Sequence, residues 1–199
     1  MKFYRSVEYP AVPAHLISDN YTDPSQYQTV KEFKKFDYGQ DHYWQGEFIP
    51  APEYCIYTVK NQDLIDWVKQ NVSPNYAEIQ LIVTRHKDQG RMIVHTDMSR
   101  KLALNYIINA GGNNVKTNWF QEHDKPVIRS TKPNFAQTDT GFVEYDNLDL
   151  LDSVECNANS WTIIRTDVLH DVSNISGNRT FLSIKFSNDY EQELLKTFD

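Results

Sequence analysis

Long hydrophobic runs, clusters of basic residues and cysteines are all scarce in this 199-residue sequence. No apolar stretch approaches the length of about 20 residues that a membrane-spanning helix requires. Lys and Arg number 20 against 27 Asp and Glu, which gives a net charge of −7, and no basic block stands out. We therefore expect no membrane insertion and no non-specific binding to nucleic acid, because the latter needs a basic surface.

The cysteine content favours a reducing compartment. Only Cys55 and Cys156 are present, and no apolar signal segment follows Met1. Two cysteines in an otherwise ordinary composition favour free thiols over a disulfide framework. We expect a cytoplasmic protein, and its oligomeric state stays open. With 40% hydrophobic residues, the chain can form one domain with a packed core.

The first part of the chain, residues 1–75, is predicted to be an N-terminal elaboration. Prolines interrupt its short apolar segments, so we interpret residues 1–55 as an extended lead that wraps the core. A helix is predicted over residues 61–72. Asn61 can cap this helix, its apolar residues share one face, and Pro74 follows its end.

From residue 79 to 187 the pattern changes to short β-rich runs separated by turn residues. Strands are predicted at 79–84, 92–97, 102–108, 115–120, 127–129, 142–145, 160–165, 168–172 and 179–186. The acidic stretches 139–141 and 146–152 are expected to be solvated loops. A C-terminal helix is expected over 188–199. The many short strands predict a mainly β fold, a β-sandwich or jelly roll with flanking helices.

The candidate metal ligands begin with His95 and Asp97, which are separated by one residue. Positions i and i+2 of a strand share a face, so an imidazole and a carboxylate can converge on one ion. His170 supplies a second imidazole far downstream. Two histidines and one carboxylate with open coordination positions form the facial triad of non-haem Fe(II) oxygenases.

Arg179 follows His170 and begins a strictly alternating segment. Leu182, Ile184 and Phe186 fall on one face, and the opposite face carries Arg179, Phe181, Ser183 and Lys185. If residues 168–186 form a hairpin with its turn at Ser176 and Gly177, then His170 and Arg179 share a face. A one-residue slip of the turn would separate them. Arginine suits a carboxylate-bearing co-substrate.

These residues together resemble a 2-oxoglutarate/Fe(II) oxygenase with a double-stranded β-helix (jelly-roll) core. The resemblance covers roughly residues 79–187, and the segment from His170 to Ser183 is similar to the aspartyl/asparaginyl- and prolyl-hydroxylase-like branches. It implies that His95, Asp97 and His170 bind Fe(II) and that Arg179 binds the distal carboxylate of 2-oxoglutarate. Many relatives have a serine or threonine two residues after this arginine, whereas this chain has Phe181.

The resemblance also implies the reaction. We expect a hydroxylase that uses Fe(II), 2-oxoglutarate and O2, with ascorbate as a candidate reductant, and releases succinate and CO2. Its substrate would be a small molecule or a peptidyl group, with a proline, aspartate or asparagine side chain favoured. Asn105 is a candidate for holding the co-substrate. Arg100 would contact either an acidic substrate group or a neighbouring carboxylate.

Two alternatives stay open at this point. A cupin-type metal enzyme that does not use 2-oxoglutarate would occupy a similar barrel. Such sites usually carry more histidines and need no arginine at the position of Arg179. A non-catalytic jelly-roll binding module would also keep the fold, although all three candidate ligands are present here.

Overall fold

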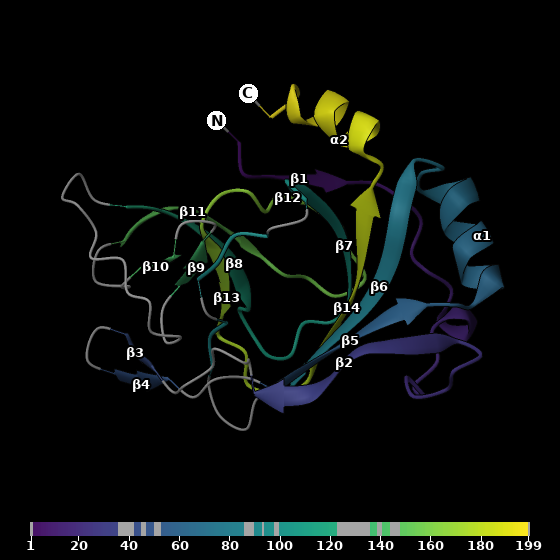
Figure 1. Ribbon diagram of the computed structural model, residues 1–199, viewed down its shortest axis with the longest axis horizontal. Helices are drawn as coiled ribbons and strands as arrows, with labels where there is room; N and C mark the ends of the chain where they lie inside the picture. Colours follow the sequence, from purple (N-terminus) through teal and green to yellow (C-terminus); the bar gives the residue numbers. More distant parts are fainter. Residues whose placement is uncertain are drawn as a thin grey trace.

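The computed structural model describes residues 2–35, 42–44, 47–49, 53–85, 90–92, 94–97, 100–122, 136–138, 141–143 and 148–198. Antiparallel strands dominate it, so the prediction of a mainly β fold is confirmed (Figure 1). The predicted strand at 127–129 lies outside the described residues. No helix in the described part of the chain is long and apolar enough to cross a membrane. Both cysteines are free thiols.

Two antiparallel sheets form the body of the protein. The large sheet has seven strands in the order β1 (Tyr4–Val7), β12 (Trp161–Arg165), β7 (Leu102–Asn109), β14 (Arg179–Phe186), β6 (Tyr76–Arg85), β5 (Glu53–Val59) and β2 (Tyr27–Lys35). The small sheet has the order β11 (Leu148–Glu155), β8 (Lys116–Glu122) and β13 (His170–Ser173).

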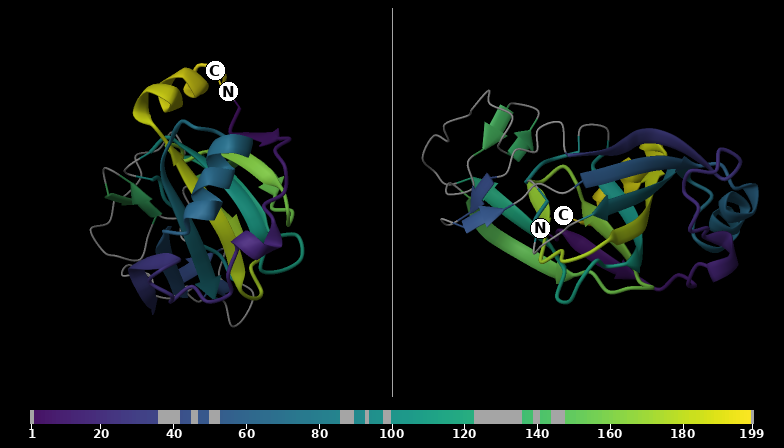
Figure 2. Two further views of the ribbon diagram at one scale, coloured as in Figure 1. Left: turned by 90° about the vertical axis from the view of Figure 1, so that its right-hand side faces the viewer. Right: turned by 90° about the horizontal axis from the view of Figure 1, so that it is seen from below.

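The remaining elements are short. Two ribbons pair β3 (His42–Trp44) with β4 (Glu47–Ile49) and β9 (Ala136–Thr138) with β10 (Gly141–Val143). The helices are η1 (Ala14–Leu16), α1 (Gln62–Asn71) and α2 (Asn188–Leu195). The two termini lie side by side, joined by a hydrogen bond from the Lys2 amide to the Phe198 carbonyl (Figures 1 and 2).

The chain passes repeatedly between the two sheets. After β6 in the large sheet, residues 94–97 lie beside β13, joined to it by a bridge between His95 and His170. The chain then enters β7 in the large sheet, β8 and β11 in the small sheet, β12 in the large, β13 in the small and β14 in the large. This winding is that of a double-stranded β-helix, which is a jelly roll.

Alternation along β6 determines what each face of the large sheet contacts. Ile79, Leu81 and Val83 are buried in the main hydrophobic core together with Leu64 and Val68 of α1. Consequently α1 covers the face of the large sheet that points away from the small sheet (Figure 1). The intervening β6 residues face the small sheet and line a cavity there, namely Glu78, Gln80, Ile82 and Thr84.

Residues 2–35 lie along the main core, with Val12 and Leu16 buried in it, and they also extend the large sheet, with β1 at one edge and β2, next to β5, at the other. Two expectations from the sequence were wrong. The acidic stretch 146–152, expected to be a loop, enters the edge strand β11 at Leu148. Residues 168–186 do not form a hairpin, because β13 and β14 belong to different sheets.

Candidate metal centre

His95 and His170 are brought together by their own backbones. The His95 amide donates to the His170 carbonyl at 2.9 Å, and the His170 amide donates to the His95 carbonyl at 3.0 Å. Directly opposed residues of an antiparallel pair share a face, so both imidazoles project to the same side. The two ring centroids lie 4.4 Å apart.

Asp97 completes the group from the same segment as His95. Its Oδ1 lies 3.6 Å from His95 Nε2, while its Oδ2 accepts a hydrogen bond from Arg100 Nε at 2.6 Å. Arg100 also donates from Nη1 to Ser183 Oγ at 2.8 Å. Arg100 therefore occupies one carboxylate oxygen and orients the other toward the histidines. Arg100 was predicted to contact either an acidic substrate group or a neighbouring carboxylate. The structure shows the second of these contacts, with Asp97.

The environment holds both Asp97 and His170 in the protonation states that bind metal. Burial raises the pKa of the Asp97 carboxyl, but the charge of Arg100 and the two imidazoles outweigh burial, so the pKa lies below its usual value. Burial and the neighbouring His95 lower the pKa of His170 to about 4. At neutral pH, Asp97 is thus a carboxylate and His170 a neutral imidazole.

His170 is also oriented by a hydrogen bond of its ring. Nδ1 lies 2.9 Å from the Val168 carbonyl, which can only accept. The proton is therefore assigned to Nδ1, and the lone pair of Nε2 is available to a metal. This use of a backbone carbonyl to fix the tautomer is typical of metal-binding histidines.

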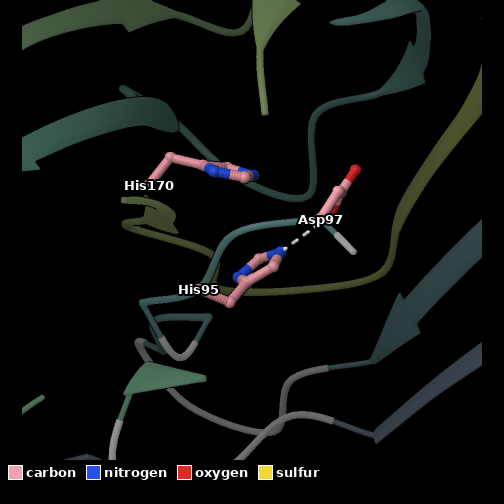
Figure 3. A group of neighbouring side chains, drawn as sticks. All are labelled: His95, Asp97 and His170. Carbon is pink, nitrogen blue, oxygen red and sulfur yellow. Dashed lines mark ion pairs between the residues drawn. The ribbon is translucent and has the colours of Figure 1, made fainter. Parts of the chain in front are cut away.

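The three side chains fit a single metal ion. One ligand atom from each of His95, Asp97 and His170 can be chosen so that all three lie within 4.8 Å of one another. Figure 3 shows the three side chains converging, with the carboxylate of Asp97 beside the His95 ring. Metal–ligand bonds to N and O are roughly 2.0–2.2 Å, so small side-chain rotations suffice for one ion to contact all three.

The metal centre opens into a cavity of about 530 Å³ between the two sheets. All six predicted site residues line this cavity: His95, Asp97, Arg100, Asn105, His170 and Arg179. His170 belongs to the small sheet and Arg179 to the large sheet, and both line the cavity. The two residues therefore reach a common space, as predicted, but they do so because the two sheets pack face to face and not because β13 and β14 form a hairpin.

Arg179 is a buried cation at one end of the cavity. Its side chain is 3% exposed, and burial lowers the pKa of its guanidinium. The guanidinium carbon lies 4.0 Å from the centroid of the Phe181 ring. Among the described residues, no carboxylate pairs with Arg179, and its Nε has no hydrogen-bond partner. A buried arginine with an open donor is suited to an anionic ligand.

Asn105 is the other buried polar group left open in the cavity. It is 7% exposed, and its Oδ1 has no hydrogen-bond partner. Asn105 lies directly opposite Ser183 on β14, so it faces the cavity from β7. Leaving such a group unpaired costs free energy, which a ligand with a hydrogen-bond donor would recover.

Gly111 packs closely against Arg179, the first residue of β14, and we predict that Gly111→Ala disturbs Arg179. The residue has a φ of +84°, and an added Cβ would lie 2.7 Å from Arg179 Cβ. We expect a loss of roughly 1–3 kcal/mol in the free energy of unfolding from the strained conformation. The matched control is Gly177→Ala, whose Cβ would meet only the Gly111 carbonyl at 3.6 Å. Equal denaturation midpoints for the two variants would contradict this assignment.

The sequence-based prediction missed the polar residues that line the cavity from β6, which include Thr84, Gln80 and Glu78. The signal was present in the sequence. Thr84 pairs with Arg179 and Glu78 with Lys185, and alternation on β14 already places these two β14 residues on one face. If the pairing of β6 with β14 had been known, Thr84 and Glu78 would have been added to the predicted site as the partners of these two residues.

Comparisons with known proteins give structural neighbours at low identity. No protein-family model and no curated protein matches the sequence. The chain is similar to YcfD of E. coli (9% identity, TM-score 0.47), covering 97% of this chain and 52% of that one, so it spans about half of YcfD.

Two further neighbours are of similar size to this chain. A 2OG-Fe(II) oxygenase-family oxidoreductase from Burkholderia pseudomallei has 8% identity and a TM-score of 0.43, covering 85% of this chain and 76% of that one. A prolyl-4-hydroxylase from Pseudomonas putida has 10% identity and a TM-score of 0.40, covering 94% and 92%.

Proposed function

We propose that this protein is an Fe(II)- and 2-oxoglutarate-dependent dioxygenase that hydroxylates an unactivated C–H bond of an amino-acid or peptidyl substrate. One observation carries the proposal. The group of His95, Asp97 and His170 opens into the same cavity as Arg179, a buried cation without a carboxylate partner among the described residues. A metal triad and an anion site in one cavity fit a co-substrate that chelates a metal and bears a second carboxylate.

The metal and the co-substrates would supply the oxidation. Fe(II), 2-oxoglutarate and O2 together would supply two linked changes: the keto acid becomes succinate and CO2, and one oxygen atom is inserted into a C–H bond. The chain's own part is geometric. His95, Asp97 and His170 hold three coordination positions, Arg100 fixes the Asp97 carboxylate, and the remaining positions face the cavity. We also propose that ascorbate serves as a reductant for the bound iron.

Arg179 would bind the distal carboxylate of 2-oxoglutarate. Phe181 occupies the position where many relatives have a hydroxyl, and here its ring supports the guanidinium. Two other hydroxyls line the cavity, from Thr84 on β6 and Thr117 on β8. Thr84 is directly opposite Arg179 and only 1% exposed. We assign the second carboxylate contact to these threonines. Asn105 would make a supporting contact through its amide Nδ2, which can donate to an oxygen of the co-substrate.

Replacing Arg179 tests this assignment without relying on turnover. In Arg179→Gln we expect the Kd for 2-oxoglutarate to rise about 10- to 100-fold, because a hydrogen bond to a charged group contributes roughly 1.5–3 kcal/mol. The measurement is calorimetric titration of 2-oxoglutarate into Mn(II)-loaded protein. Mn(II) affinity should be unchanged, since Arg179 is not a ligand.

The control for this variant is Arg5→Gln, which removes a partly exposed arginine that donates to Thr197 and does not line the cavity. It should bind 2-oxoglutarate as the wild type does. If Arg179→Gln also binds 2-oxoglutarate with unchanged affinity, the co-substrate does not use this end of the cavity. A cupin-type metal enzyme would then describe the site better.

A further inference from the structure

A pair of opposite charges lies at the end of the cavity away from Arg179. Glu78 on β6 and Lys185 on β14 are directly opposed residues, and both line the cavity. Each is partly exposed, so each is within reach of a ligand. Arg179 begins β14 and Lys185 lies six residues later, a separation of roughly 20 Å at the rise of a strand. The pair is therefore too distant to bind the same carboxylate as Arg179.

The Glu78 carboxylate and the Lys185 ammonium are not in contact with each other. No ion pair joins Glu78 to Lys185, although neighbouring strands hold them face to face. Glu78 Oε1 instead accepts a hydrogen bond from Thr58 Oγ1 at 3.2 Å, which orients the carboxylate from β5. Within the part of the chain that the structure describes, the Lys185 ammonium has no carboxylate partner.

The metal centre lies between this charged pair and Arg179. Ser183 precedes Lys185 by two residues on the same face of β14, which is roughly 7 Å at the rise of a strand. Ser183 accepts a hydrogen bond from Arg100, and Arg100 holds Asp97. A small molecule held at Glu78 and Lys185 can thus extend toward the metal ligands. Gln80 on β6, directly opposite Ser183, lines the cavity at this level, whereas Ile82 and Ile56 line it farther along, toward Arg179.

We propose that Glu78 and Lys185 bind the α-ammonium and α-carboxylate groups of a free amino acid, which is the substrate. This inference rests on the proposed function and chooses between its two substrate classes. A residue within a peptide has neither charge, so it would leave both Glu78 and Lys185 without ionic partners. A purely acidic ligand would be repelled by Glu78, and a purely basic one by Lys185. Only a zwitterion satisfies both charges.

The test uses anaerobic protein loaded with Fe(II) and 2-oxoglutarate. Each standard L-α-amino acid is added, and in parallel its N-acetyl amide, in which both α-charges are blocked. Binding is followed through the change that a substrate causes in the optical band of the metal and keto acid, and turnover through succinate. We expect at least one free amino acid to bind, and its N-acetyl amide to bind at least tenfold more weakly.

Charge-removing variants locate the binding site. Glu78→Gln and Lys185→Gln should each raise the half-saturating concentration of that amino acid at least about tenfold. Neither should change the half-saturating concentration of 2-oxoglutarate. The matched controls are Glu155→Gln and Lys116→Gln, an exposed pair directly opposed on β11 and β8, outside the cavity. These controls should leave amino-acid binding unchanged.

Failure of this inference is distinguishable from failure of the proposed function. If the optical band forms but no free amino acid binds, or the N-acetyl amides bind equally well, the charged pair does not select a free amino acid. Equal effects of Lys185→Gln and Lys116→Gln would overturn the assignment of the site. If folded, metal-loaded protein gives no band before any amino acid is added, the proposed function itself is wrong and this inference falls with it.

Discussion

The variant Asp97→Ala is expected to lose the metal and, with it, oxidation of 2-oxoglutarate. Asp97 is the only carboxylate in the candidate triad, and it pairs with Arg100. Its removal deletes one ligand and leaves a cation beside the two histidines. A bound metal contributes several kcal/mol to catalysis, so we expect succinate formation to fall roughly a thousandfold or more.

Two measurements separate this effect from misfolding. Bound Fe(II) is measured per chain after removal of free metal, and stability is measured by chemical denaturation. Asp63→Asn is the control, because Asp63 is an exposed carboxylate in the first turn of α1. It should retain both metal and turnover. Full metal content and turnover in folded Asp97→Ala would show that Asp97 is not a ligand.

The second large effect is expected on stability, from Asp171→Ala. Asp171 is fully buried and lies next to His170 on β13. Its carboxylate accepts hydrogen bonds from Arg91 and, at 2.7 Å, from Asn118 Nδ2. Removing one member of a buried ion pair typically costs about 3–5 kcal/mol, because the attraction between the two charges no longer offsets the cost of their burial. We expect a loss of that size in the free energy of unfolding.

A double-mutant cycle with Arg91→Ala isolates the contribution of the pair. We expect Asp171→Ala combined with Arg91→Ala to cost less than the sum of the single changes, by roughly 1 kcal/mol or more. The measurement is urea denaturation followed by fluorescence, with the m-value compared among the variants. Additive losses would mean that the two side chains stabilise the protein independently. Metal affinity should also fall in Asp171→Ala, because β13 carries His170.

The parts of the site that the sequence predicted depend on local periodicity. His95 and Asp97 share a face because they are two residues apart in an extended segment, and β14 separates its apolar face from Arg179 and Lys185 by strict alternation. Both relations hold within one extended segment, so they need no knowledge of the tertiary fold, although residues 94–97 form only an isolated bridge in place of the predicted strand. The convergence of Arg179 with His170 was also predicted, although the hairpin argument for it was wrong.

The parts that could not be predicted depend on pairing between distant segments. Nothing local shows that β13 pairs with residues 94–97 and β8 while β14 enters the other sheet. The edge strand β11 was mistaken for a loop because it lacks an alternating apolar pattern, and Leu150 is 60% exposed there. An edge strand in contact with solvent has little need of that pattern.

The central claim is that one cavity binds Fe(II) and 2-oxoglutarate together. The most direct measurement is the absorption spectrum of the protein with Fe(II) and 2-oxoglutarate under anaerobic conditions. We predict a weak metal-to-ligand charge-transfer band in the wild type that is absent in Asp97→Ala and needs more 2-oxoglutarate to appear in Arg179→Gln. Folded wild-type protein that retains Fe(II) but gives no band at saturating 2-oxoglutarate would contradict the claim.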